Sequence, residues 1–485
     1  MVDPRRRALL KAAALLPLAG ACGGVAVAGP RAAAAHFAVQ ADRPGRRVSE
    51  SLAGLSYETL QLAEPAFFAA DNHALVQLCR AVNPQGVLRI GGNTSDDTVW
   101  SGYRGPLPAF APRKRGLQQP FVLKPQALHA LAGFLRATGW KLVFGVNLRI
   151  GVPAMAAELA TAVQRIVGDH LLAIQIGNEA NNYERDYASF DAAWAPYARA
   201  IRAAGVPIAG PDTGANTDWV IEYARRHGRE NVFLSRHYYR DAAPNGSIPD
   251  LLGGDPAFMA EVEQAMRAAD AAGLPFHLTE ANSYYFGGRD GVSNVFASAL
   301  WGADFMLALA QRGVAGVQFH GGTLESVEAS LGRDADTGAA GADREARRNA
   351  VTSRYSAIAG DVSLGFQPRP LYHGMVLAQR FAGARMLHAT LDAGAANLTA
   401  YAARREGAVL VALVNKDAAR DAAVTVSGLP RGAAGRAMRL RAPALDSREG
   451  IAFGDAESTV SDAHGLCRIA VPRGSAVWVE FNETV

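Results

Sequence analysis

The sequence predicts a (β/α)8 barrel followed by a C-terminal β-sandwich domain that also takes a strand from the N-terminal part of the chain. From about Leu52, short apolar runs alternate with longer amphipathic runs, which is typical of repeated βα units. Eight such apolar runs precede about Phe381, the number that closes a barrel. Beyond Phe381, short alternating segments are separated by Gly, Pro and Asp, as in β-sandwiches.

Composition excludes several other classes of protein. The 485 residues are 49% hydrophobic and 19% charged, with 50 Gly and 24 Pro, which is not the composition of a collagen-like, disordered or coiled-coil chain. Three cysteines without a CxxC motif or a Cys/His cluster are too few for a disulfide scaffold and offer no zinc site. We therefore expect neither a metal nor another cofactor.

Residues 1–28 have the features of a secretory leader. Basic residues from Arg5 to Lys11 precede an apolar stretch that ends in Ala26-Val27-Ala28. The pair Arg6-Arg7 resembles a bacterial twin-arginine signal, and Cys22 lies in an imperfect lipoprotein box, which would permit a lipid anchor. We expect a secreted or periplasmic bacterial protein that contacts a membrane only through such an anchor.

The net charge of +4 is concentrated in that leader. Removing it leaves 45 basic against 44 acidic residues, because four of the 49 basic and one of the 45 acidic residues are lost. A nearly neutral protein has no general attraction for nucleic acid, so a nucleic-acid partner is not expected.

The predicted barrel strands are the apolar runs, and the predicted helices are the amphipathic runs between them. The strands are Leu52–Tyr57, Val87–Ile90, Lys141–Asn147, Leu171–Gly177, Pro207–Gly210, Val232–His237, Phe276–Thr279 and Val314–Phe319. The clearest helices are Gln126–Thr138, Tyr187–Ala204, Pro256–Ala272 and Val295–Gln311.

These elements divide the chain into three parts after the leader. Residues 37–50 are expected to form an extended strand of the β-domain, residues 51–382 the barrel, and residues 383–485 the β-sandwich. The segment Leu324–Ser353 is a polar insertion after the eighth strand, much longer than an ordinary barrel loop. It would act as a lid or stay mobile.

Two carboxylates follow predicted barrel strands. Glu179 comes after the fourth strand and Glu280 after the seventh, and the carboxyl ends of barrel strands carry the active site. Glycoside hydrolysis needs two such groups, one to protonate the departing oxygen and one to attack or to activate water. Asn178, directly before Glu179, could bond the sugar 2-hydroxyl. Glu179 and Glu280 therefore fit the catalytic pair of a glycosidase.

These motifs resemble the large clan of retaining (β/α)8 glycosidases. The flanking sequence is more narrowly similar to glycoside hydrolase family 79, the heparanase and β-glucuronidase group, from about Phe37 to the end. Its most specific part is the segment from Glu280 to Gly288, which is similar to the family's nucleophile segment and implies that Glu280 is the nucleophile and Glu179 the acid/base. The resemblance implies that the Tyr285 hydroxyl and the backbone amides of the loop, Gly287 among them, bind the carboxylate of the substrate.

Further positions match the family one by one, and the resemblance implies a substrate-binding role for each. They are Glu58 and Asn93 after strands one and two, His237 and Tyr239 after strand six, Gln318 and His320 in strand eight, and Tyr355. Tyr355 departs from the family pattern, because the insertion separates it from strand eight.

The resulting prediction is a retaining endo-β-D-glucuronidase of heparanase type that acts on heparan-sulfate-like polysaccharide. The endo choice rests on five basic residues between Ser101 and Pro125, a stretch without acidic residues, which would attract a sulfated polymer. They are Arg104, Arg113, Lys114, Arg115 and Lys124. The first alternative is an exo-β-glucuronidase, in which the basic stretch is only a solvated loop. The others are a clan relative that cleaves a neutral sugar and a surface lipoprotein that binds polysaccharide without cleaving it.

Overall fold

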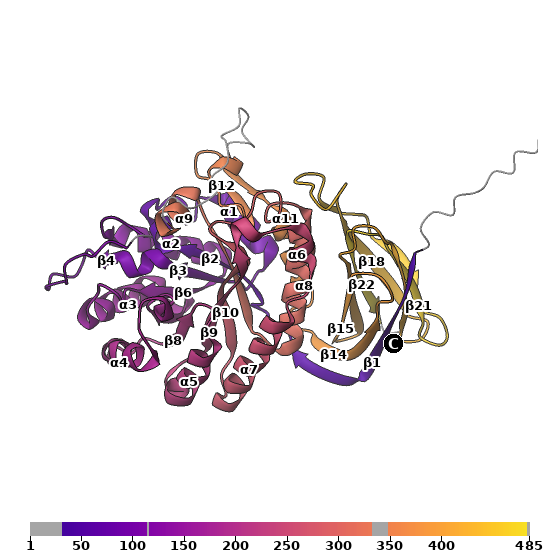
Figure 1. The fold of residues 1–485 in the computed structure, drawn as a ribbon, viewed down its shortest axis with the longest axis horizontal. Helices are drawn as coiled ribbons and strands as arrows, with labels where there is room; N and C mark the ends of the chain where they lie inside the picture. Colours follow the sequence, from indigo (N-terminus) through magenta and orange to yellow (C-terminus); the bar gives the residue numbers. More distant parts are fainter. Residues whose placement is uncertain (1–31, 114–115, 332–347, 483–485) are drawn as a thin grey trace, which may run out of the picture. The chain divides into compact units, whose positions relative to one another are not determined.

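Eight parallel strands close into a barrel in the spatial order β10-β11-β2-β3-β6-β7-β8-β9 (Figure 1), which confirms the predicted (β/α)8 fold. The computed structural model describes residues 32–113, 116–331 and 348–482. The barrel strands are β2 (Ala53–Glu58), β3 (Val87–Gly91), β6 (Lys141–Val146), β7 (Leu171–Ile176), β8 (Ile208–Thr213), β9 (Leu234–Ala242), β10 (Phe276–Tyr285) and β11 (Gly316–Gly321).

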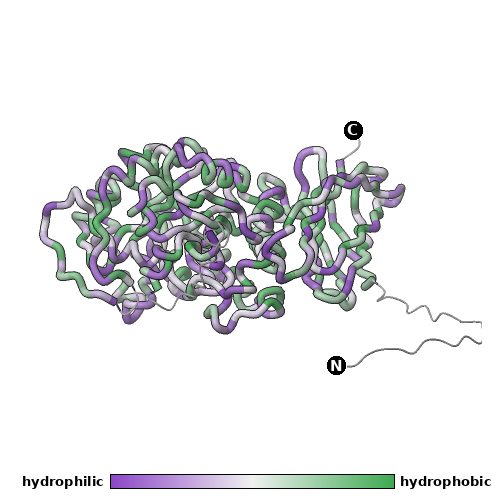
Figure 2. Tube along the Cα trace, turned by 90° about the horizontal axis from the view of Figure 1, so that it is seen from above, coloured by the Kyte–Doolittle hydropathy of each residue, from purple (hydrophilic) through white to green (hydrophobic). Residues whose placement is uncertain are grey.

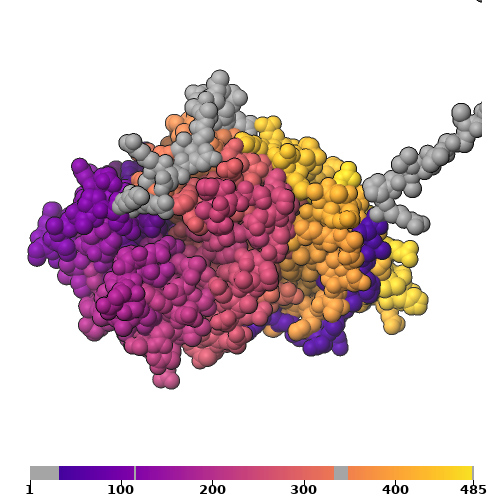
Figure 3. All heavy atoms as spheres, in the orientation of Figure 1, coloured from indigo at the N-terminus to yellow at the C-terminus, as the bar shows by residue number. Residues whose placement is uncertain are grey.

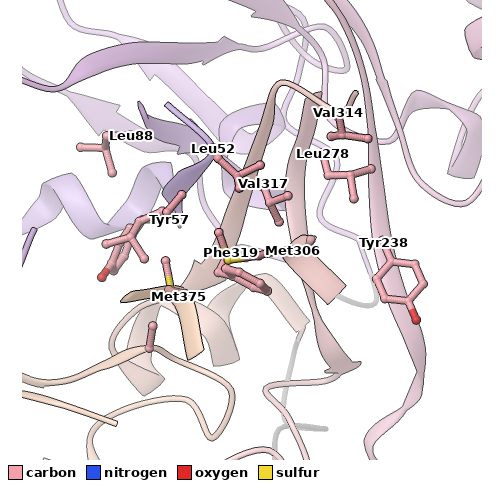
Figure 4. Close-up of a cluster of buried hydrophobic side chains, with 14 of the residues drawn as sticks. Leu52, Tyr57, Leu88, Tyr238, Leu278, Met306, Val314, Val317, Phe319 and Met375 are labelled. Carbon is pink, nitrogen blue, oxygen red and sulfur yellow. The ribbon is translucent and has the colours of Figure 1, made fainter. Parts of the chain in front are cut away.

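Helices surround the barrel and bury their apolar faces against it. They are α1 (His73–Val82), α2 (Pro125–Thr138), α3 (Pro153–Val167), α4 (Tyr187–Ala203), α5 (Thr217–His227), α6 (Ile248–Leu252), α7 (Pro256–Ala272), α8 (Phe296–Arg312), α9 (Leu324–Leu331) and α11 (Pro370–Gln379). Several begin at a side chain that accepts a bond from a free amide of the first turn, as Asn216 does from Trp219. Figure 4 shows part of the core, where Leu52 and Val317 gather with Met306 of α8.

Strands β8, β9 and β10 run further toward the barrel mouth than the apolar runs predicted. Strand β10 continues from the predicted end at Thr279 to Tyr285, and β9 continues from His237 to Ala242. The extra residues are mostly polar, because they line the mouth rather than the core. The hydrophobic pattern alone therefore ends these three strands too early.

The barrel interior is layered. Val87, Val143, Ala173 and Ala209 form a small apolar cluster near the beginnings of their strands. Two residues further along, β3 and β7 present the polar side chains Arg89 and Gln175, both of which are fully buried. The period of two in a strand explains the change, and it places a buried polar layer directly beneath the mouth.

The C-terminal strands form a second, mostly antiparallel sheet, ordered β19-β18-β22-β16-β15-β14-β1-β17-β21, with β20 on β18. Their bounds are β14 (Arg385–Asp392), β15 (Leu398–Arg405), β16 (Ala408–Asn415), β17 (Ala422–Ser427), β18 (Ala434–Arg441), β19 (Ala452–Phe453), β20 (Glu457–Val460), β21 (Cys467–Val471) and β22 (Ser475–Asn482). Figure 2 shows hydrophobic and hydrophilic residues interspersed along them.

Strand β16 is apolar without alternation because both of its faces are covered. Val409, Val411 and Leu413 belong to the core of the β-domain, whereas Leu410 and Ala412 belong to the core that includes the barrel. A strand buried on both faces is expected to be a continuous apolar run.

The chain enters this sheet before it enters the barrel. Strand β1 (Ala33–Arg47) pairs antiparallel with β14 and parallel with β17. Figures 1 and 3 show it in indigo among the orange and yellow C-terminal strands. It begins four residues before the expected start at Phe37.

Two pairs of short strands lie outside the two main sheets. The strands β4 (Thr98–Trp100) and β5 (Phe121–Leu123) pair with each other, and the chain between them reaches away from the barrel in Figure 1. The strands β12 (Ile358–Asp361) and β13 (Gly365–Pro368) form a hairpin. Of the predicted insertion, residues 332–347 lie outside the described residues, and its first part is the helix α9.

Candidate active site

A cavity of about 660 Å³ opens at the carboxyl ends of the barrel strands. Its lining brings together nine of the twelve residues that the sequence singled out, from six of the eight strands and from the segment after β11. They are Glu58, Asn93, Glu179, His237, Tyr239, Glu280, Tyr285, His320 and Tyr355. The cavity is therefore the candidate active site.

The two carboxylates flank this cavity. Glu179 follows β7 with a left-handed backbone (φ 48°), and its amide donates to the carbonyl of Asp212 at 2.9 Å. Glu280 lies in β10 beside an irregularity in the pairing with β9, which re-aims a side chain. One carboxylate oxygen of Glu179 and one of Glu280 lie within 4.8 Å of each other. Retaining glycosidases hold their carboxyl groups about 5–5.5 Å apart, whereas inverting ones need about 6.5–9.5 Å.

His237 connects the two carboxylates to the buried layer. Its Nδ1 lies 2.9 Å from Glu179 and 3.9 Å from Glu280, and its Nε2 lies 2.9 Å from Asp212. Burial alone would lower the pKa of His237, but the charges of Asp212 and Glu280 outweigh burial and raise this pKa to about 10. His237 is therefore an imidazolium at neutral pH, with both ring nitrogens donating.

Arg89 and Asp212 form the centre of the buried polar layer. Arg89 donates through Nη1 to Glu280 at 2.5 Å and through Nη2 to Asp212 at 2.6 Å. The Asp212 carboxylate also accepts from Gln175 at 2.7 Å and from Thr279 at 2.6 Å. Such multiple pairing makes burial of these charges tolerable.

Sequence reasoning missed both residues. The available signal was the lone arginine in the otherwise apolar run Val-Leu-Arg-Ile-Gly at 87–91, since an arginine is almost never fully buried unless it is paired. Asp212 follows a Gly-Pro pair at the end of β8 with a left-handed backbone (φ 57°). Nothing in its local sequence distinguishes it from a loop residue.

Glu280 is held as a carboxylate. Burial would raise its pKa, but the charges of His320, His237 and Arg89 outweigh burial and lower it to about 2. The Tyr239 hydroxyl donates to the other oxygen of Glu280 at 2.8 Å. An ionised, oriented carboxylate is what a nucleophile requires.

A hydrogen-bonded wall lines the side of the cavity formed by β2 and β3. Glu58 accepts from the Thr94 hydroxyl at 2.7 Å and from the Thr94 amide at 2.9 Å. The Asn178 Nδ2 atom donates to Asn93 at 3.1 Å, and its carbonyl oxygen accepts from Arg89 at 2.6 Å. Asn178 itself adjoins the cavity without being part of its lining.

His320 and Gln318 point into the barrel from the same strand at different depths. His320 lies at the mouth, where Nε2 is 3.6 Å from Glu58 and Nδ1 is 3.8 Å from Glu280. Gln318 is two residues earlier and opposite Gly54, so it lies one layer deeper, fully buried and away from the cavity lining. The structure therefore does not bring Gln318 into the site that the resemblance implied.

Aromatic residues form the wall beside Glu280. The ring of Tyr239 lies 6.3 Å from that of Tyr285 and 6.0 Å from that of Tyr355. Tyr285 is 38% exposed, whereas Tyr355 is buried. The Gly287 carbonyl accepts from the Tyr355 amide at 3.2 Å, so the loop after β10 and the segment after the insertion are joined here. Gly287 adjoins the cavity without lining it.

The basic stretch between Ser101 and Pro125 is partly neutralised. Arg113, which lines the cavity, is 3.2 Å from Asp97, and Arg149 pairs with the same carboxylate. Asp97 is fully buried and lies just before the stretch from Ser101 to Pro125, which has no acidic residues. Part of the charge of Arg113 is therefore neutralised within the protein. Lys114 and Arg115 lie outside the described residues.

The acidic groups and His237 also have the spacing of metal ligands. One atom each from Glu179, His237 and Glu280 lie within 4.8 Å of one another. However, Arg89 contacts Glu280 at 2.5 Å, and the imidazolium of His237 carries a second positive charge. The positive charges of Arg89 and His237 would repel a metal ion bound between these side chains.

The expected leader and the lipid-anchor position Cys22 lie outside the described residues. Within the part of the chain that the structure describes, no helix combines the length and the apolar character needed to cross a membrane.

Comparison with known proteins gives weak relatives in sequence and a clear match in fold. No family model matches. The chain is 48% identical over 58 residues to a β-glucuronidase of Neurospora crassa, covering 12% of this chain and 10% of that protein. It is 23% identical over 306 residues to a β-glucuronidase of Aspergillus niger, covering 54% and 55%. The matches thus span at most about half the length of these relatives.

Solved structures resemble nearly the whole chain. A 4-O-α-L-rhamnosyl-β-D-glucuronidase from Fusarium oxysporum superposes with a TM-score of 0.70 at 18% identity, over 92% of this chain and 99% of that one. An arabinofuranosidase from Xanthomonas axonopodis gives a TM-score of 0.65 at 16% identity, over 93% and 100%. The shared feature is the fold of barrel and appended sheet.

Proposed function

We propose that this protein is a retaining β-D-glucuronidase, related to glycoside hydrolase family 79, in which Glu280 is the nucleophile and Glu179 the acid/base. The observation that carries the proposal is the pair of carboxylates within 4.8 Å across one cavity, which is nearer to the short spacing of retaining glycosidases than to the wide spacing of inverting ones. The weak sequence relatives, both β-glucuronidases, support the sugar class.

In the proposed reaction the two carboxyl groups take different roles. Glu280 attacks the anomeric carbon, while Glu179 gives its proton to the departing oxygen. A covalent glycosyl-enzyme forms, and Glu179 then removes a proton from the water that attacks it. Tyr239, which donates to Glu280 at 2.8 Å, orients the nucleophile, and Arg89 holds it ionised.

The wall of Tyr285 and Tyr355 supports recognition of a carboxylated sugar. Phenol hydroxyls and backbone amides can hold a carboxylate without a contacting cation. A neutral hexose that covers this wall would leave such donors without partners, which costs affinity.

The departing group must lie beside Glu179. Asn182, which donates to Glu179 at 2.8 Å, lies there with Tyr183, Gly214 and Ala215. A Cβ atom at Gly214 would lie only 3.2 Å from a Glu179 oxygen, so glycine keeps this approach open. The side chains next to Glu179 on this side are neutral.

Endo cleavage of heparan-sulfate-like polymer is the finer form of the proposal, and exo removal of terminal glucuronic acid is its alternative. The argument for endo cleavage is the set of basic residues between Ser101 and Pro125. One of these residues, Arg113, is already paired with Asp97. Product size separates the two forms, because exo action releases only free glucuronic acid. Secretion through the leader belongs to the same proposal, and the mass of the mature N-terminus tests it.

The decisive experiment follows 4-nitrophenyl β-D-glucuronide by time-resolved NMR. We expect β-glucuronic acid to form first, with the α-anomer appearing only through mutarotation. Initial formation of the α-anomer would overturn the retaining mechanism. Absence of any hydrolysis, with retained binding of polysaccharide, would instead support the non-catalytic alternative. E280Q is the matched inactive control.

A further inference from the structure

Two arginines pair with a single carboxylate next to the aromatic wall, and a third arginine lies close enough to feel their charges. Arg448 lies 2.9 Å from Asp290, and Arg354 lies 3.6 Å from it. Arg369 has no carboxylate within ion-pair distance among the described residues, and it donates instead to the Ser353 and Asn349 carbonyls. We call Arg354, Arg369, Arg448 and Asp290 the arginine cluster.

The arginine cluster carries uncompensated positive charge, with Arg354 and Arg369 buried and with Arg448 and Asp290 nearly half exposed at its edge. Arg354 and Arg369 are 6% and 5% exposed, and the Nε atom of each is buried without a hydrogen-bond partner. Burial, followed by the charges of Arg354 and Arg448, lowers the pKa of Arg369 to about 9. Arg369 is still charged at neutral pH, so three guanidinium groups face one carboxylate.

The cluster is built on the same two segments as the aromatic wall. Arg354 directly precedes Tyr355, and Asp290 lies five residues after Tyr285 on the loop that follows β10. These segments touch, since a Cβ atom at Gly288 would lie 2.7 Å from the Tyr355 amide nitrogen. The cluster is thus within a few residues of Tyr285 and Tyr355, yet none of its members lines the cavity.

Among the residues that the structure describes, this wall of the cavity is lined by Tyr285, Phe286 and Tyr355, none of which is a cation. Neutral donors can orient a carboxylate, but they add little long-range attraction. Charges held in a poorly polarisable interior act over longer distances and are screened less than surface charges.

We propose that the arginine cluster determines specificity for an anionic sugar, supplying at a distance the positive potential that the contacting tyrosines lack. This inference rests on the proposed function, because it assumes that the sugar carboxylate faces Tyr285 and Tyr355. In this proposal the tyrosines orient the sugar carboxylate by hydrogen bonds, and the arginines attract it by their positive charge.

The test is a charge series at one ion pair. D290N makes the cluster more positive by one charge and R448Q less positive by one, although both break the same contact. We expect D290N to lower the inhibition constant of D-glucuronate about three- to tenfold and R448Q to raise it by a similar factor. The double variant should return close to the wild type. Inhibition by neutral 4-nitrophenyl β-D-glucoside should stay unchanged throughout.

A purely structural ion pair predicts the opposite pattern, because loss of the contact would move both single variants in the same direction and on both ligands. That outcome, or no change in either variant, would overturn the inference. R289Q offers a second route, since Arg289 is exposed on the same loop and makes no ion pair with any described residue. It should raise the constant for D-glucuronate, and R267Q on the exposed face of α7 is its matched control.

Failure of the proposed function has a different signature. If the wild type neither hydrolyses glucuronides nor is inhibited by D-glucuronate, the sugar class is wrong. If it does both while D290N and R448Q fail to move in opposite directions, only the role of the arginine cluster is lost.

Discussion

The Nδ1 atom of His237 lies 2.9 Å from a carboxylate oxygen of Glu179, so the residue assigned as acid/base is bonded to a histidine whose pKa is raised to about 10. The opposite ring nitrogen is fixed by Asp212 at 2.9 Å. A chain of contacts therefore runs from the buried layer of the barrel to the group that must exchange a proton with the leaving oxygen.

Asp212 is a positioning residue in this chain, and D212N tests that role. Loss of its charge should lower the pKa of His237 and reduce kcat on the order of 10²-fold. Because His237 then loses its proton at a lower pH, the alkaline limb of the pH–rate profile should move to lower pH. A reduced rate with an unshifted limb would indicate a structural role only. D250N, which removes an acid paired with Arg240, is the control.

The raised pKa of His237 also predicts how stability depends on pH. A group whose pKa is higher in the folded state contributes its full stability below its unfolded pKa and loses it as pH rises through its folded pKa. The free energy of unfolding should therefore fall by a few kcal/mol between about pH 6.5 and pH 10. Urea unfolding at several pH values measures this fall. E280Q removes one of the charges that raise this pKa, so its fall should be smaller.

The lowered pKa of Glu280 predicts that the free energy of unfolding also falls at low pH. Its pKa is lowered to about 2 from 4.5, so its contribution is present above pH 4.5 and is lost as pH falls toward 2. Acid unfolding of E280Q should lack this component. An identical acid transition in E280Q and the wild type would contradict the lowered pKa.

The assigned roles of Glu179 and Glu280 differ in their response to the leaving group. Both E179Q and E280Q should reduce turnover by several orders of magnitude. With an activated leaving group such as 2,4-dinitrophenol, E179Q should spare the first step, because little protonation is needed, and the glycosyl-enzyme should accumulate as a burst. Equal damage on good and poor leaving groups would refute the acid/base assignment.

Tyr285 and Tyr239 form a matched pair for testing specificity. Y285F should cost glucuronide hydrolysis roughly 1–3 kcal/mol more than any residual glucoside hydrolysis, through a lost bond to a charged group. Y239F, which removes the donor to Glu280, should harm both sugars alike. The ratio of kcat/KM for the two substrates is the measurement, and equal losses in Y285F would show that Tyr285 packs rather than selects.

The polymer-grip hypothesis concerns the basic triplet Arg113-Lys114-Arg115. Replacing all three by Ser should depress cleavage of heparan sulfate at low salt while sparing a small aryl glucuronide. R113S by itself breaks the contact with Asp97 and so changes the loop as well as its charge. The variant K114S/R115S removes two positive charges and keeps that contact, so it tests the effect of charge alone. Loss of both activities in parallel, or of neither, would reject the grip, and release of free glucuronic acid alone would establish exo action.

The sequence alone predicted the barrel and the carboxylate pair. Hydrophobic periodicity is a local property, and it identified all eight barrel strands, although β10 extends to Tyr285 rather than Thr279. Because parallel strands open at one end of a barrel, a glutamate after the fourth strand and one within the seventh had to meet at the same mouth. Glu179 and Glu280 could therefore be paired without coordinates.

Only the tertiary structure determined the electrostatics around that pair. Arg89 appears in sequence as one cation in an apolar strand, and its role comes from partners on other strands, among them Asp212 and Glu280. Arg113 appeared as a free positive charge until folding brought it to Asp97. Gln318 and His320 share a face of β11 but lie at different depths in the barrel. Gln318 is therefore a core residue, whereas His320 lines the cavity. Charge pairing and depth depend on residues distant in the chain, which periodicity does not encode.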